Sequence, residues 1–513
     1  MTLRTELTLL DEPRLEFRHG QTAVDPHSGL SLYGPYDADR NAPGRVSYAV
    51  VGTAAAIDAF ASFAEAISGP IADSGLDEAE RQDLSLERHR IKQNALWPAF
   101  PGFGTAFATQ WRKSAITSRT VDEDAVSQVL GNKDDHRRVF GAVDLFLDHV
   151  RIASERDDPP SVVVCVVPDT IWLKCRPLSR ISEGYSQRPS KSEIAIRRKT
   201  GDLFDFYDPV EYEYSTDFRR QLKARALTYK VPIQLVLEST LNLDPAISAR
   251  VTPLTDRAWN LATAIYYKAG GRPWRLVSAR PGVCYIGLTF KRQRPEDSSA
   301  RTAACAAQMF LDTGDGIVFR GETGPWYSPE ERQYVLGRNN ARALLGGVLA
   351  AYREQGGQAL REIFLHTHSN IPEDDFAGFA EACPENARIV GIRVRRASHT
   401  ARLFRPGTYP VLRGTTWILG DRTAFLWTNG FKPHLLTYDG WMAPAPIRLD
   451  IQHGAADIRQ VATDILGLTK LNYNACRSGD AMPVTVKFSD RVGEILVSNP
   501  TVEERQPNFK YYI

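Results

Sequence analysis

Four side chains that can bind an anion lie between residues 219 and 268. Arg219 and Lys223 are four residues apart, Gln234 follows after ten more residues, and Lys268 comes later. Guanidinium and ammonium groups donate charge-assisted hydrogen bonds to phosphate oxygens, and an amide side chain can both donate and accept. If these four groups converge, they form a small anion pocket suited to a phosphate. The alternative is that two cations at this spacing simply mark a solvated helix face.

Two helices and one strand must position these groups. Residues 216–226 predict a short helix, because apolar residues recur every four positions and a threonine and an aspartate can cap its start. Both of its cations then leave the same face. Residues 231–237 predict a buried strand, and residues 253–267 predict a second helix that ends at Lys268 before a Gly270-Gly271 cap. The recurring apolar residues of the first helix are Phe218, Leu222 and Ala226.

The spacing of these residues resembles the guide 5′-phosphate pocket of the MID domain in Argonaute proteins. The match includes Tyr266-Tyr-Lys-Ala-Gly-Gly-Arg-Pro-Trp274 around the last lysine. The resemblance implies that Arg219, Lys223, Gln234 and Lys268 bind the 5′-phosphate of a guide strand.

After residue 275 the pattern of elements changes. Three strands, a helix, a strand, a short helix and a strand are expected in that order, which is the order of an RNase H-like domain and resembles the core of a PIWI domain. The segments Asp464–Asn474 and Pro483-Val-Thr485 also resemble the end of a PIWI domain. We therefore expect an α/β protein with an extended N-terminal arm (1–40), a Rossmann-like MID domain (41–275) and an RNase H-like PIWI domain (276–513). The expected PIWI strands are 283–290, 303–311, 316–320, 362–366 and 388–394, with a long helix at about 329–355.

The nuclease positions of the PIWI pattern lack carboxylates. An active RNase H-like centre holds two divalent metals with acidic side chains. The resemblance puts Thr289 and His368 at two of these positions and Asn472, close to Asn474, near the last one. Because a hard Mg²⁺ ion requires anionic oxygens, this predicts a PIWI domain that does not cut its target.

A rival interpretation is an active endonuclease with displaced carboxylates. Acidic residues near the expected strand ends are Asp312, Asp315, Glu322, Asp374 and Asp375.

The last five residues, Phe509-Lys-Tyr-Tyr-Ile513, are apolar and aromatic. The resemblance implies that the terminal carboxylate of Ile513 enters the MID pocket and holds, with Gln234, a Mg²⁺ ion on the guide phosphate. The alternative is an ordinary docked or frayed chain end.

Composition narrows the class of protein. The 513 residues carry a net charge of +2, so any nucleic-acid surface must be a local patch. Six scattered cysteines without a CxxC pair indicate reduced core residues and no zinc site, and neither a signal peptide nor a membrane span is evident. We expect a cytoplasmic protein.

Two further segments are interpreted without a ligand. The basic stretch 182–201 is interpreted as a solvated loop in preference to a nucleic-acid contact, and the βα unit at 45–67 lacks the glycine pattern of dinucleotide binding.

The resemblance as a whole is to short prokaryotic Argonautes with an inactive PIWI domain. It implies a sensor in prokaryotic defence that loads a 5′-phosphorylated guide RNA, recognises single-stranded DNA from plasmids or phages, and activates a separate APAZ-domain effector. That effector would carry an NAD-depleting TIR or sirtuin-like domain, or a nuclease. We expect a heterodimer that assembles further on target binding, with the apolar run from Leu7 to Phe17 adding as a strand to the partner.

Overall fold

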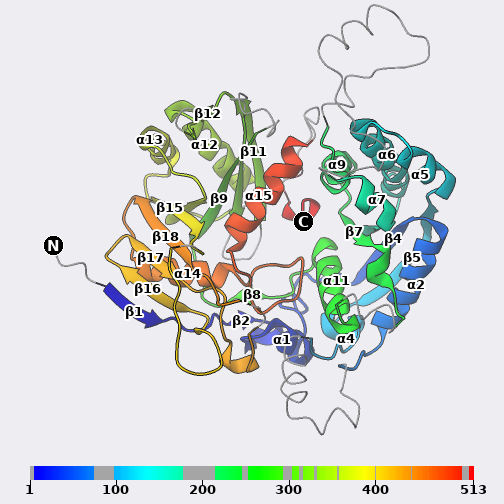
Figure 1. Ribbon diagram of the computed structural model, residues 1–513, viewed down its shortest axis with the longest axis horizontal. Helices are drawn as coiled ribbons and strands as arrows, with labels where there is room; N and C mark the ends of the chain where they lie inside the picture. The colour runs from blue at the N-terminus through cyan, green and yellow to red at the C-terminus, as the bar shows by residue number, and fades with distance from the viewer. Residues whose placement is uncertain are drawn as a thin grey trace, which may run out of the picture.

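The structure is a computed structural model (Figure 1). It describes residues 5–73, 97–176, 214–244, 252–292, 303–310, 316–328, 332–354, 357–398, 400–438, 440, 442–498, 506 and 508–513. The basic stretch 182–201, Asp312 and Asp315 lie outside these residues.

The MID half is built on a parallel four-stranded sheet in the order β5-β4-β6-β7. Every residue of β6 is buried, as expected for a continuous apolar run in a central parallel strand. Helices α5, α6 and α9 share one core with the sheet, while α2 and α11 contribute to the core on its other face. This is a Rossmann-like arrangement. The strands are β4 (Arg45–Gly52), β5 (Gln110–Thr120), β6 (Val162–Val167) and β7 (Ile233–Leu237). The helices are α2 (Ala54–Ser68), α4 (Phe103–Phe107), α5 (Glu123–Leu130), α6 (Asp135–Ser154), α7 (Asp169–Lys174), α9 (Phe218–Ala226) and α11 (Leu254–Lys268), with short 3-10 turns η4 (Leu227–Tyr229) and η5 (Glu238–Leu241).

The PIWI half is built on a nine-stranded sheet in the order β1-β16-β17-β18-β15-β14-β9-β10-β11. Strands β9, β10 and β11 form the expected antiparallel meander, and β14 runs parallel to both β9 and β15. Helices α12 and α13 cover one face, and α14 and α15 pack on the other. The strands are β9 (Val283–Arg292), β10 (Ala303–Phe310), β11 (Gly316–Gly324), β12 (Tyr327–Ser328), β13 (Gln333–Tyr334), β14 (Glu362–Thr367), β15 (Arg388–Arg396), β16 (Thr415–Leu419), β17 (Thr423–Leu426) and β18 (Ile447–His453). The helices are α12 (Arg338–Glu354), α13 (Glu373–Ala382), α14 (Ile458–Leu468) and α15 (Val484–Val497), with 3-10 turns η6 (Pro433–Leu435) and η7 (Phe509–Tyr511).

The N-terminal arm is integrated into the fold. Strand β1 (Thr5–Leu9) pairs with β16 at the edge of the PIWI sheet, and β2 (Leu15–Glu16) pairs with β3 (Thr22–Ala23) and β8 (Arg275–Leu276). Helix α1 (Pro26–Tyr33) follows β3 and is capped by the Asp25 carboxylate, which accepts from the Ser28 amide. A 3-10 turn, η1 (Arg18–Gly20), lies between β2 and β3.

One large core joins the two halves. It includes Trp259 of α11, Leu466 of α14 and Phe488 of α15. The Trp274 indole donates to the Lys470 carbonyl at 3.0 Å, and the Tyr473 hydroxyl donates to the Trp274 carbonyl at 2.9 Å. The residues that surround the MID pocket are therefore held by packing from both sides. Within the described ranges, no helix is both long and apolar enough to cross a membrane.

Candidate nucleic-acid interface

Helix α9 presents the first two cations of the MID pocket. The Asp217 carboxylate accepts from the Arg220 amide at 2.9 Å and caps the helix. Phe218, Leu222 and Ala226 are all buried, as their spacing predicted. This core stripe fixes the rotation of α9, so Arg219 and Lys223 leave it on a common side.

Lys223 is a buried cation that is only 2% exposed. Its ammonium group donates to the carbonyl oxygen of Ile233 at 3.3 Å and to the oxygen of Ile513, the last residue of the sequence. Burial, with the charges of Lys268 and Arg219, holds the pKa of Lys223 well below its usual range.

Lys268 stands at the end of α11 and is 1% exposed. Its ammonium group donates to the side-chain oxygen of Gln234 and, at 3.5 Å, to that of Asn474 in the PIWI half. Burial and the charge of Arg219 lower the pKa of Lys268 to about 7. Gly270, with φ of +100°, lets the chain turn away after the helix, as the glycine pair predicted.

The structure thus brings Lys223, Gln234 and Lys268 together, and Arg219 lies near enough for its charge to act on both lysines. Burial and the charge of Arg491 also lower the pKa of Arg219. Within the described part of the chain, neither lysine forms a salt bridge with an aspartate or glutamate side chain. Buried ammonium groups that repel one another are unfavourable without an anion. Three basic side chains are thus held close together away from water.

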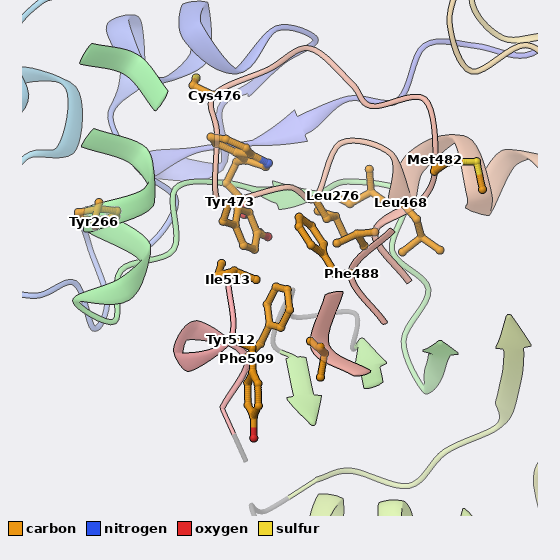
Figure 2. Close-up of a cluster of buried hydrophobic side chains, with 14 of the residues drawn as sticks. Tyr266, Leu276, Leu468, Tyr473, Cys476, Met482, Phe488, Phe509, Tyr512 and Ile513 are labelled. Carbon is orange, nitrogen blue, oxygen red and sulfur yellow. Dashed lines mark hydrogen bonds between the residues drawn. The ribbon is translucent and has the colours of Figure 1, made fainter. Parts of the chain in front are cut away.

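The C-terminal tail reaches these residues, where Ile513 contacts Lys223. Figure 2 shows Ile513 between Tyr473 and Phe509, in the shared core that also includes Phe488. Ile513 is 4% exposed, and the rings of Phe488 and Phe509 meet edge to face at 5.3 Å. The tail therefore holds the Ile513 oxygen on the Lys223 ammonium. Together with the Gln234 oxygen it provides hard oxygen donors of the kind that Mg²⁺ prefers, so the donor chemistry fits the expected cation.

A second cluster lies where α15 packs on β9. The backbone approach is so close that a Cβ at Gly287 would stand 2.0 Å from the Thr485 carbonyl oxygen. Thr289 follows two residues later on the same side of the strand and donates its hydroxyl to the Asp490 carboxylate at 2.8 Å. His368, just beyond the end of β14, places Nε2 3.7 Å from the other Asp490 oxygen. The structure thus brings Thr289 and His368 together around Asp490.

Asp490 was not singled out from the sequence, and Asn472 does not occupy this place. The Asn472 amide donates to the Asp480 carboxylate at 2.9 Å, and its oxygen accepts from the Asn474 amide at 3.0 Å. Since Asn474 in turn contacts Lys268, Asn472 supports the MID pocket. In the pattern of residues 484–497, Asp490 lies on the polar stripe with Lys487 and Glu494, so the sequence carried no signal that set it apart.

The displaced acids of the rival interpretation have other partners where they are described. The Asp375 carboxylate accepts from the amides of Leu336 and Gly337, and Asp374 accepts from the Arg338 amide, at 2.8–3.0 Å. These two acids therefore hold the start of α12. Glu322 lies in β11. Within the described ranges, no group of three or more histidine, cysteine, aspartate or glutamate side chains is placed to hold a metal ion.

Comparison with solved structures identifies the fold. Clostridium butyricum Argonaute, bound to a guide DNA and a 19-mer target DNA, matches with a TM-score of 0.61 at 14% identity, over 99% of this chain and 55% of that one. Aquifex aeolicus Argonaute matches with a TM-score of 0.55 at 13% identity, over 99% of this chain and 56% of that one. Drosophila Piwi matches with a TM-score of 0.55 at 12% identity, over 98% of this chain and 56% of that one. The chain thus has an Argonaute-like fold and spans just over half the length of these proteins. No family model matches the sequence, and no curated protein matches it significantly.

Proposed function

We propose that this Argonaute-like chain is a guide-loaded sensor that recognises a complementary strand without cutting it. The observation that carries the proposal is the MID pocket, where Lys223 and Lys268 are buried beside Arg219 with no carboxylate side chain to balance them. The terminal phosphate of a guide strand would bring further negative charge to these basic groups, beside the Ile513 oxygen that Lys223 already contacts. Its oxygens accept from the two ammonium groups and from the Arg219 guanidinium.

A Mg²⁺ ion fits the same pocket. The oxygens of Gln234 and Ile513 would be its protein ligands, and guide phosphate oxygens would complete its shell. Both oxygens now accept from lysine ammonium groups, so the phosphate would draw those lysines to itself and release the oxygens for the ion. Guide and ion are expected to bind cooperatively.

Recognition of the target would rest on base pairing, with the protein contacting the backbone. We propose an RNA guide and a single-stranded DNA target of plasmid or phage origin. The solved Clostridium butyricum protein holds a DNA guide, so both guide types belong in the test. We propose that the chain does not cut its target, because Thr289 and His368 stand where a two-metal nuclease needs carboxylates.

The partner is proposed to be an APAZ-domain effector that docks on the arm. Strand β1 stands at the end of the nine-stranded sheet, and among the residues that the structure describes it pairs with β16 alone. Leu7 and Leu9 on this strand are 59% and 54% exposed, whereas Leu15 and Phe17 are buried. An open edge with exposed apolar side chains suits strand addition by a second polypeptide. Of the Leu7–Phe17 run, we therefore propose Leu7 and Leu9 of β1 as the docking residues.

The proposal is tested on material from the native host. The chain is isolated with its neighbouring open reading frame, and the nucleic acid that copurifies is analysed for sugar type and 5′ end. We expect short RNA with 5′-phosphate ends and an effector activity that rises when complementary single-stranded DNA is added. Copurified strands with 5′-hydroxyl ends, or an effector equally active without target, would contradict the proposal.

A further inference from the structure

We propose that Lys291 takes the place of a metal ion in the cluster around Asp490, and that this cluster is a metal-independent binding site for a backbone phosphate of the target strand. This inference rests on the proposed function, since it assumes that a guide–target duplex passes over the PIWI sheet. It adds a binding site that lies apart from the guide-phosphate pocket.

The first step is the position of Lys291. Residues 287, 289 and 291 alternate along β9 and face α15. At Gly493 of α15, a Cβ would stand 2.8 Å from the Thr289 methyl group and 3.1 Å from Cγ of Lys291. The lysine stem is therefore packed against the helix, so its ammonium group is held in the cluster.

The second step is charge. The Lys291 ammonium lies 3.3 Å from Asp490 and 3.7 Å from Glu494, which also pairs with Arg220 at 3.0 Å. Lys291 and Arg220 thus pair with the two carboxylates. In a two-metal nuclease the acidic side chains are neutralised by divalent ions, whereas here two basic side chains are paired with them. A divalent cation entering this cluster would be repelled by Lys291. It would also have to compete with Thr289 and His368 for the oxygens of Asp490.

The third step is the ligand. An ammonium group has three donors, and two carboxylates leave one of them for an incoming anion. His368 directs Nδ1 to the Val394 carbonyl at 2.9 Å, so that nitrogen is the donor, and Nε2 lies on the Asp490 side. The side chains of His368, Asp490 and Lys291 are 42%, 39% and 25% exposed, so a ligand can reach them. A non-bridging oxygen of a phosphodiester is the ligand that matches a partly exposed ammonium group in a nucleic-acid-binding fold.

The test measures target affinity of guide-loaded protein as a function of KCl concentration. Target and guide carry different fluorophores, so that guide retention is followed in the same titration. Lys291→Met removes the cation, Lys291→Arg keeps it, and Lys174→Met removes an exposed lysine of α7 as a control for net charge. We expect Lys291→Met to weaken target binding about three- to tenfold at low salt and to reduce the slope of log K against log [KCl] by about 0.7–0.9, the value of one phosphate contact. Guide retention should stay unchanged, and Lys291→Arg should behave like the native chain.

A second arm measures metal binding directly, by calorimetry with Mn²⁺ in the absence of guide. The double variant Thr289→Asp/His368→Asp is compared with the triple variant that also carries Lys291→Met. We expect a bound Mn²⁺ in the triple variant and none in the double variant at the same concentrations. The inference is overturned if Lys291→Met matches Lys174→Met in affinity and slope, or if the double variant binds Mn²⁺ as tightly as the triple one. If the native chain does not bind a guide at all, the proposed function is refuted instead.

Discussion

The Thr289 hydroxyl donates to the Asp490 carboxylate at 2.8 Å, so the one acid in this cluster that faces both Thr289 and His368 is already satisfied by protein groups. We predict that guide-loaded protein leaves a complementary DNA or RNA target intact in Mg²⁺ or Mn²⁺, because a two-metal centre cannot assemble there. Products are resolved on a denaturing gel after long incubation. A guide-directed break at one phosphodiester, lost in Asp490→Asn, would show that the centre is active.

The packing of α15 on β9 should be sensitive to a single methyl group. Gly287→Ala places a Cβ 2.0 Å from the Thr485 carbonyl oxygen, so the helix must shift. We expect destabilisation of roughly 1–3 kcal/mol, read as a lower thermal midpoint. Gly346→Ala in α12 is the matched control, because its Cβ meets no atom within 4 Å. That change should be neutral or stabilising by roughly 0.5–1 kcal/mol. Equal midpoints for the two variants would contradict the close packing.

The arm should contribute a pH-dependent part of the stability through Glu12. Burial alone would raise the pKa of this carboxyl, but Arg413 at 3.0 Å and Lys470 at 2.6 Å outweigh it and lower the pKa to about 2. Because the folded pKa lies below the unfolded one, the stabilisation is present above about pH 4.5 and is lost as the pH falls towards 2. It amounts to at most roughly 3 kcal/mol.

Thermal unfolding of Glu12→Gln tests this linkage. The variant leaves Arg413 and Lys470 buried without their carboxylate, so its midpoint should be clearly lower at pH 7. The difference from the native chain should shrink between pH 4.5 and pH 3. A constant difference over that range would mean that Glu12 is not the titrating group.

The exposed leucines of β1 should matter for the partner and not for the fold. Leu7→Lys/Leu9→Lys should change the free energy of unfolding of the isolated chain by no more than about 0.5 kcal/mol, since both side chains are more than half exposed. Copurification with the effector should be lost, because charged side chains protect a strand edge from pairing. Leu32→Lys, on the 70% exposed Leu32 of α1, is the control and should copurify normally. Normal copurification of the double variant would place the partner elsewhere.

Much of the fold was predictable where sequence patterns are local. The apolar run 231–237 predicted strand β7, and the apolar stripe of residues 216–226 predicted helix α9 and the face that carries its cations. Strand β5 was missed, because Gln110–Thr120 is mostly polar and lies at the edge of the MID sheet. The pairing of β1 with β16 was also missed. It joins residues about four hundred positions apart, and nothing in either short strand specifies its neighbour.

The two candidate sites differ in the same way. The MID pocket residues lie on consecutive elements, so their convergence followed from local structure. The cluster around Asp490 is assembled from β9, the end of β14 and α15. Whether Asp490 reaches Thr289 and His368 depends on the rotation of α15. Asn472 was chosen by its proximity in sequence to the expected motif, whereas helix packing brings Asp490 to Thr289 and His368.

The central claim is that buried cations in the MID pocket bind the 5′-phosphate of a guide. The most direct measurement is a filter-binding comparison of 5′-phosphorylated and 5′-hydroxyl guides of one sequence, at one salt concentration with Mg²⁺, for the native chain, Lys223→Ala, Lys268→Ala and the control Lys174→Ala. Charge-assisted hydrogen bonds of about 1.5–3 kcal/mol each predict at least a tenfold preference for the phosphorylated guide. Each pocket variant should narrow that preference, while Lys174→Ala should leave it unchanged. Equal affinities of the native chain for the two guides would contradict the account.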